Sequence, residues 1–102
     1  IDIHNFRTIR YGPVLHIDCH VTLPWYYDLE KAHREIADIE ELVNAKCARE
    51  VELFIHMDPC VPRSCPVCSL KECPVRKAPF SKRIHWTLDT AMVNRKHGLD
   101  AI

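Results

Sequence analysis

Histidine and aspartate side chains recur at alternate positions in two stretches of the sequence. His16, Asp18 and His20 lie in the first stretch, and His56 and Asp58 lie in the second. Because successive side chains of a β-strand point to opposite faces, each set would share one face of a sheet. Imidazole nitrogens and carboxylates bind zinc and related divalent ions at about 2 Å. His20, His56 and Asp58 are therefore candidate metal ligands, with solvated surface residues as the alternative interpretation, and His16 fits a surface or supporting role.

A second candidate group consists of four cysteines with the spacing C-x4-C-x2-C-x4-C: Cys60, Cys65, Cys68 and Cys73. A tetrahedral zinc site needs four sulfurs about 2.3 Å from the ion, and short loops around a central C-x2-C pair supply them. An iron–sulfur cluster uses the same ligands, and two disulfides or four free thiols are further alternatives. The pattern favours structural zinc. Cys19 and Cys47, by contrast, fit small buried hydrophobic residues.

Apolar periodicity predicts the elements that position these residues. Alternation predicts strands, and apolar residues at steps of three and four predict a helix of roughly 17 residues with Asp28 as its N-cap. In chain order the predicted elements are a strand over 6–11, a strand over 14–23, a helix from Leu29 to near Lys46 and a strand over 51–58. An antiparallel sheet with the helix on one face would bury these patterns, which predicts the α+β class. The candidate His and Asp ligands would then lie on the face opposite the helix.

The sequence changes character after Pro59. Residues 59–80 hold five prolines and four cysteines with little periodicity, so this segment cannot build an apolar core of its own. A helix is predicted over 87–97, with Gly98 at the C-cap position. We therefore expect one domain over 1–59 and a four-cysteine extension with a C-terminal helix over 60–102.

Composition disfavours several classes of function. Fourteen basic residues balance fourteen acidic ones, so no basic excess is available for nucleic acid. No stretch approaches the roughly 20 apolar residues that a membrane crossing needs. With two glycines there is no Gly-rich phosphate loop, and no Ser or Cys nucleophile has a clearly placed base, so we expect no enzyme. Because the chain begins with Ile1 rather than Met, we interpret it as part of a longer protein.

Four short motifs follow one another along residues 1–60. They are His4-Asn5-Phe6-Arg7-Thr8 with Gly12, Ile17-Asp18-Cys19-His20, Leu29-Glu30-Lys31-Ala32-His33 and Ile55-His56-Met57-Asp58-Pro59-Cys60. In order and spacing they resemble the C-terminal cytoplasmic domain of the cation diffusion facilitator (cation efflux) transporters. The resemblance implies a ferredoxin-like, or metallochaperone-like, β-β-α-β fold whose first helix precedes Ile1.

The resemblance also implies a function and a set of ligands. It suggests a regulatory homodimer on the cytoplasmic face of the membrane, attached to the transmembrane domain of the same transporter and binding divalent ions, most simply zinc. The implied ligands are His4, His20, His33, His56 and Asp58. Three of these also follow from strand alternation, whereas His4 and His33 do not. His33 lies beside the apolar stripe of the predicted helix, where a ligand for a partner subunit would explain its position.

The four-cysteine segment lies outside the pattern of this family. The cytoplasmic placement that the resemblance implies argues against disulfides, because that compartment keeps thiols reduced. Two functions of other classes compete with the transporter domain. One is a soluble metallochaperone or iron–sulfur redox protein that uses the four cysteines. The other is a zinc-ribbon module that binds nucleic acid through the basic tail, which the zero net charge disfavours.

Overall fold

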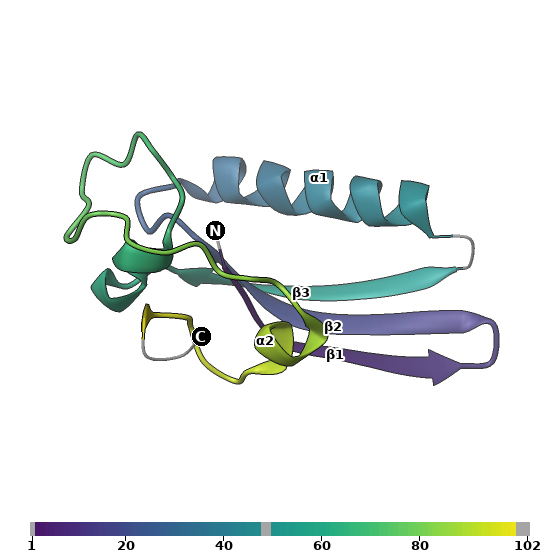
Figure 1. Ribbon diagram of the computed structural model, residues 1–102. Helices are drawn as coiled ribbons and strands as arrows, with labels where there is room; N and C mark the ends of the chain where they lie inside the picture. Colours follow the sequence, from purple (N-terminus) through teal and green to yellow (C-terminus); the bar gives the residue numbers. More distant parts are fainter. Residues whose placement is uncertain (1, 48–49, 100–102) are drawn as a thin grey trace.

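The computed structural model describes residues 2–47 and 50–99 of the chain. Three strands, β1 (Asp2–Tyr11), β2 (Val14–Leu23) and β3 (Val51–Pro59), form one sheet in the order β1-β2-β3. The helix α1 (Leu29–Lys46) connects β2 to β3 and covers one face of the sheet (Figure 1). The remaining elements are a 3₁₀ helix, η1 (Pro62–Val67), and a short helix, α2 (Leu88–Met92). The fold is α+β with the predicted β-β-α-β order.

The sheet is mixed, so the prediction of an antiparallel sheet was wrong for one of its two pairings. β1 and β2 are antiparallel, whereas β2 and β3 are parallel. The length of α1 explains the difference. Its 18 residues span about 27 Å, close to the roughly 33 Å of the ten-residue strand β2. The helix therefore returns the chain to the end at which β2 began, and β3 must run in the same direction.

Helix α1 closes the apolar core as predicted. It begins after Asp28, whose Oδ1 accepts a hydrogen bond of 2.7 Å from the backbone N–H of Lys31. Its buried residue Ile36 packs against Cys19 and its neighbours on β2. Burial of the Cys19 side chain confirms that the odd-numbered face of β2 faces the helix. The core residues are Cys19, Val21, Leu23 and Ile36, with Phe6, Tyr27, Ala32, Ile39 and Ile55 packed around them.

A β-bulge shifts the register of β1 near its start. His4 pairs with His20, but the next aligned pair is Arg7 with Asp18, so Asn5 and Phe6 together oppose one residue of β2. Asn5 adopts a positive φ of 52°, a conformation that Asn tolerates better than most residues. The extra residue leaves His4 on the face opposite α1 and turns Phe6 into the core.

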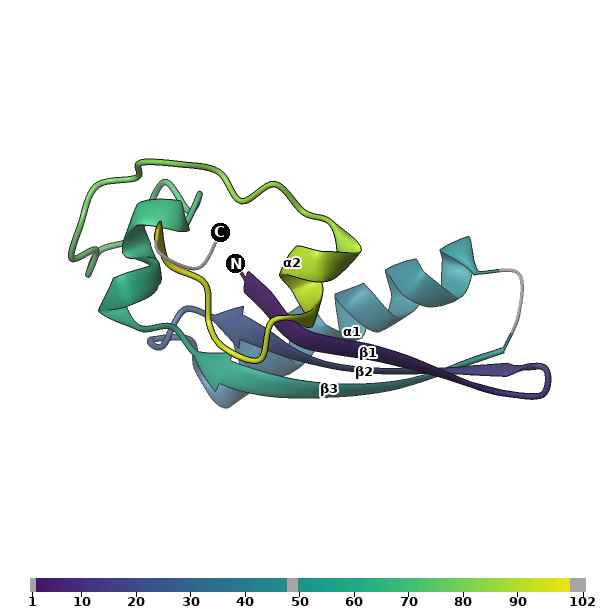
Figure 2. The same ribbon diagram turned by 60° about the horizontal axis from the view of Figure 1, so that its bottom comes forward.

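The extension covers the other face of the sheet at the start of β1. Figure 2 shows α2 on the side of the sheet opposite α1, next to β1. Only Leu88–Met92 is helical, so the prediction of a helix over 87–97 was wrong at its C-terminal half. A continued helix would pair the Val93 carbonyl with the His97 N–H. Instead Val93 accepts from Asn5 at 2.6 Å and His97 donates to Asp2 Oδ2 at 2.8 Å, so both groups bond to β1.

We expect the bulge to depend on the backbone freedom of Asn5. Asn5→Val should destabilise the protein by about 1–2 kcal/mol, because a β-branched residue strongly disfavours positive φ. Asn5→Gly should change the free energy of unfolding by much less, since Gly adopts this conformation freely. Urea unfolding measures both values. Thr8→Val, which introduces Val at an exposed regular position of the same strand, is the matched control, and equal stability of the two Val variants would contradict this role of the bulge.

Candidate metal centres

Three side chains from three strands meet on the face of the sheet opposite α1. His4 comes from β1, His20 from β2 and Asp58 from β3, and one potential ligand atom from each lies within 4.8 Å of the others. The Asp58 Oδ2 atom lies 2.9 Å from His20 Nδ1 and 3.4 Å from His4 Nε2. Alternation had placed His20 and Asp58 on this face, and the structure brings them into direct contact.

Strand pairing explains this convergence. The bulge keeps His4 directly opposite His20, and the two rings lie 5.0 Å apart between centroids. The parallel register places His56 beside His20 and Asp58 one alternation further along β3. From that position the Asp58 carboxylate reaches back to both imidazoles. The cluster therefore depends on both pairings of β2, one antiparallel and one parallel.

Burial sets the charge state of His4. The residue is 6% exposed, and this burial lowers the pKa of His4 below its ordinary value of 6.5, although the charge of Asp2 opposes the shift. A lowered pKa keeps the imidazole neutral, which is the form that binds metals. Within the part of the chain that the structure describes, His4 Nδ1 is buried and has no hydrogen-bond partner. The nitrogen that faces the cluster is the other one, His4 Nε2, which lies 3.4 Å from Asp58 Oδ2. A neutral imidazole can offer a lone pair there, so the cluster fits a divalent cation.

The other predicted histidines lie outside this cluster. The His56 ring stacks on the His20 ring, with centroids 4.8 Å apart and planes at 14°, and its side chain is exposed. His33 is exposed on α1, in the layer on the other side of the sheet. The structure therefore places His56 next to the cluster and does not bring His33 to it. His16 stacks on Phe54 and lies 3.6 Å from Glu52, in keeping with a supporting or surface role.

Asp2 and His97 also lie beside the cluster, and neither was among the predicted site residues. His97 is fully buried, and its ring contacts the Asp2 carboxylate through Nδ1 and the Thr90 carbonyl through Nε2. Because a carbonyl only accepts, Nε2 carries a proton. The contact of His97 with Asp2 anchors the extension to the start of β1. His4 follows Asp2 by two positions on the same strand. Asp2 shares the polar face with His4, and that alternation was the one available signal.

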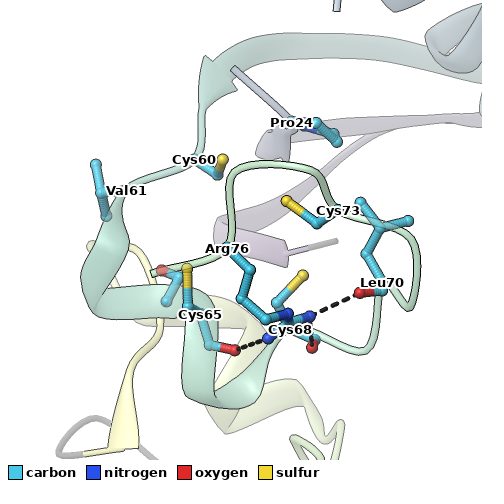
Figure 3. A pocket seen from close by; sticks show the side chains of 9 residues that line it. Pro24, Cys60, Val61, Cys65, Cys68, Leu70, Cys73 and Arg76 are labelled. Atoms are coloured by element: carbon cyan, nitrogen blue, oxygen red, sulfur yellow. Dashed lines mark hydrogen bonds between the residues drawn. The ribbon is translucent and has the colours of Figure 1, made fainter. Parts of the chain in front are cut away.

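The four cysteines of the extension line a single small pocket. Cys60 follows β3 directly, Cys65 lies in η1, Cys68 caps the end of η1 and Cys73 lies in the loop beyond. Figure 3 shows their sulfur atoms around one space, with Arg76 at its side. All four are half-buried free thiols, and Cys47 at the end of α1 is half-buried as well. The pocket has a volume of about 20 Å³.

Arg76 holds the loops of this pocket together. Its guanidinium donates four hydrogen bonds to backbone carbonyls, those of Leu70 (2.6 Å), Cys65 (2.8 Å), Cys68 (3.0 Å) and Ala78 (3.2 Å). The sequence suggested only a basic, solvated tail at this position. Composition carries no signal for such a role, because it depends on loop carbonyls that converge only in the folded chain.

Comparison with known families decides what the first part of the chain is. Residues 1–60 match the family described as the cation efflux protein, cytoplasmic domain. The chain belongs to this family. Searches of curated proteins and of solved structures gave no further match. The cation efflux domain thus contains the whole His and Asp cluster, whereas three of the four cysteines lie beyond the matched residues. Residues 93–97, the C-terminal strap that hydrogen-bonds to β1, also lie beyond them.

No helix in residues 2–47 and 50–99 is long and apolar enough to cross a membrane.

We expect the stability of the metal-free cation efflux domain to fall as the pH drops below about 6.5. In that range the unfolded chain takes up a proton at His4, while burial holds the folded pKa lower, so protonation favours unfolding. Urea unfolding at about pH 7.5 and pH 5.5 with a chelator present measures the change.

His4→Gln should lose less stability between these two pH values than the wild type. The exposed His85 is the matched control, and His85→Gln should follow the wild type. The same pH dependence in His4→Gln and in the wild type would show that the burial of His4 does not shape this response.

Proposed function

We propose that this chain is the metal-binding regulatory and dimerisation domain of a divalent cation efflux transporter, with zinc as its ion. It would act on the cytoplasmic face of the membrane as a homodimer, joined to the transmembrane domain of the same transporter. The observation that carries the proposal is the contact of His4 and His20 with one Asp58 oxygen on the face of the sheet opposite α1.

The donor set supports zinc or a similar borderline cation. Two imidazole nitrogens and a carboxylate are common zinc ligands, and zinc takes four ligands in closed sites. His4 is buried and neutral, which removes the cost of displacing a proton from it. His20 and Asp58 remain partly exposed, with side-chain accessibilities of 30% and 27%. The three residues can therefore hold an ion that still has room for a further ligand.

The surroundings of the cluster support a partner subunit as the source of that ligand. Apolar side chains on the same face remain exposed, among them Ile9, Tyr11 and Phe54. The exposed His56 ring stacks on His20, and its strand also carries the exposed Phe54. A second copy of the chain that covers the apolar residues would bring its own polar groups close to the ion. The combination of an open ligand position and an uncovered apolar face favours a dimer over a monomeric metallochaperone.

We expect Asp58→Asn to weaken zinc binding at this cluster at least tenfold, or about 1.4 kcal/mol, because the carboxylate contacts both histidines. Competition with a coloured zinc chelator at neutral pH measures the affinity. Asp18→Asn is the matched control, since Asp18 is a half-buried carboxylate on the same strand as His20 but outside the cluster.

Sedimentation velocity on the same samples tests the dimer. Zinc should shift the wild type and Asp18→Asn toward a dimer and should leave Asp58→Asn less associated. If Asp58→Asn binds zinc as tightly as the wild type, the proposed site is wrong. If zinc binding then depends on the cysteines alone, the soluble metallochaperone becomes the better function.

A further inference from the structure

The cysteine pocket beyond β3 is a second place where metal-binding side chains gather. We propose that it is a resident site for one soft divalent ion of the zinc class, held by Cys60, Cys65, Cys68 and Cys73. It is separate from the His and Asp cluster, and it does not depend on the function proposed for that cluster.

Backbone hydrogen bonds bring the four cysteines to the edge of one pocket. Cys60 extends the ladder of β2, because its N–H donates to the Leu23 carbonyl at 2.9 Å. The Cys68 N–H donates to the Cys65 carbonyl at 3.2 Å, which closes a tight turn between the two residues of the C-x2-C pair. Cys73 returns to the same pocket after a short loop. The backbone of three of the four cysteines is therefore held by hydrogen bonds, and their side chains need only rotate to bring the sulfurs onto one ion.

The size of the pocket favours a single ion over a cluster. Its volume of about 20 Å³ is close to the space that one water molecule occupies, on the order of 10–15 Å³ in the same measure. A cluster of iron and sulfide ions would need the loops to move apart. Because all four cysteines are free thiols in the structure, the disulfide alternative gains no support from it.

Arg76 is the positioning residue of this site. Two of the carbonyls that it binds belong to Cys65 and Cys68, so its guanidinium fixes the turn that carries both ligands. Four thiolates around a divalent ion have a formal charge of about −2, and a half-buried cation beside them offsets part of that charge. Arg76 is therefore suited both to shape the pocket and to balance its charge.

A resident ion would also explain how the extension keeps its shape. Residues 60–85 contain no strand or α-helix, and their buried side chains are few: Ser64, Val67 and Ile84. Segments with so little core usually need a disulfide or a metal to hold them. A closed site with four protein ligands and no open position is typical of structural rather than transported zinc.

The site is linked to the C-terminal strap, which hydrogen-bonds to the start of β1. Ser64 of η1 donates through Oγ to the His97 carbonyl at 2.5 Å, and Arg63 donates to the Lys96 carbonyl at 2.5 Å. His97 in turn binds Asp2 at the start of β1. An ion that fixes η1 therefore supports the segment that hydrogen-bonds to Asp2 and Asn5 at the start of β1.

Thiol protection in the intact chain tests the proposal without any substitution. Reduced protein is alkylated with and without one equivalent of zinc, and mass spectrometry identifies the modified cysteines. We expect zinc to slow alkylation of Cys60, Cys65, Cys68 and Cys73 at least tenfold. Cys47, half-buried at the end of α1, should react at the same rate in both samples. Equal rates with and without zinc at the four cysteines would overturn the proposal.

Cobalt(II) distinguishes this site from the His and Asp cluster. We expect cobalt to give strong sulfur-to-metal charge-transfer absorption in the wild type, Cys47→Ser and Asp58→Asn, and much weaker absorption in Cys68→Ser. Retention of the bands in Asp58→Asn would separate this site from the proposed regulatory one. Absence of the bands in the wild type, or a brown protein that contains iron and sulfide, would contradict a single-ion site.

Discussion

The one-residue offset between β1 and β2 at Asn5 is the constraint on which the rest of the structure depends. Before the offset in the chain, Asp2 and His4 point away from α1. After the offset, Arg7 pairs with Asp18, and both of these residues also lie on the face away from α1. Without the extra residue, Phe6 could not reach the core while His4 faces His20. The same bulge frees the Asn5 N–H to bind the Val93 carbonyl, which attaches the C-terminal strap. A single backbone irregularity thus serves the core, the ligand cluster and the attachment of the extension.

The extension and the sheet form one connected polar system. Asp2 accepts a hydrogen bond from the backbone N–H of the buried His97, and its carboxylate also contacts the His97 ring, which binds the Thr90 carbonyl. The His97 and Lys96 carbonyls are held from the other side by η1. Hydrogen bonds that begin in η1, beside the cysteine pocket, therefore reach Asp2, two residues from His4 on β1.

Local pattern predicted most of the fold but not the long-range contacts. Alternation and the Asp28 cap are local signals, so the strands, the helix α1 and the face that carries His20 and Asp58 followed from the sequence. His4 came only from the family resemblance, because nothing in a stretch of alternating residues shows where a bulge falls. The helix over 87–97 failed at its end because β1 competes for the Val93 carbonyl and the His97 N–H. His33 fits the family motif, yet it lies on a different layer from the cluster.

We propose that one ion binds His4, His20 and Asp58 together on the face of the sheet opposite α1. Anomalous diffraction at the zinc absorption edge, on crystals of the zinc-loaded protein, would locate that ion. We expect an anomalous peak about 2.0–2.2 Å from a nitrogen of each imidazole and an oxygen of the carboxylate. A map with a peak at the cysteine pocket and none between these three side chains would contradict it.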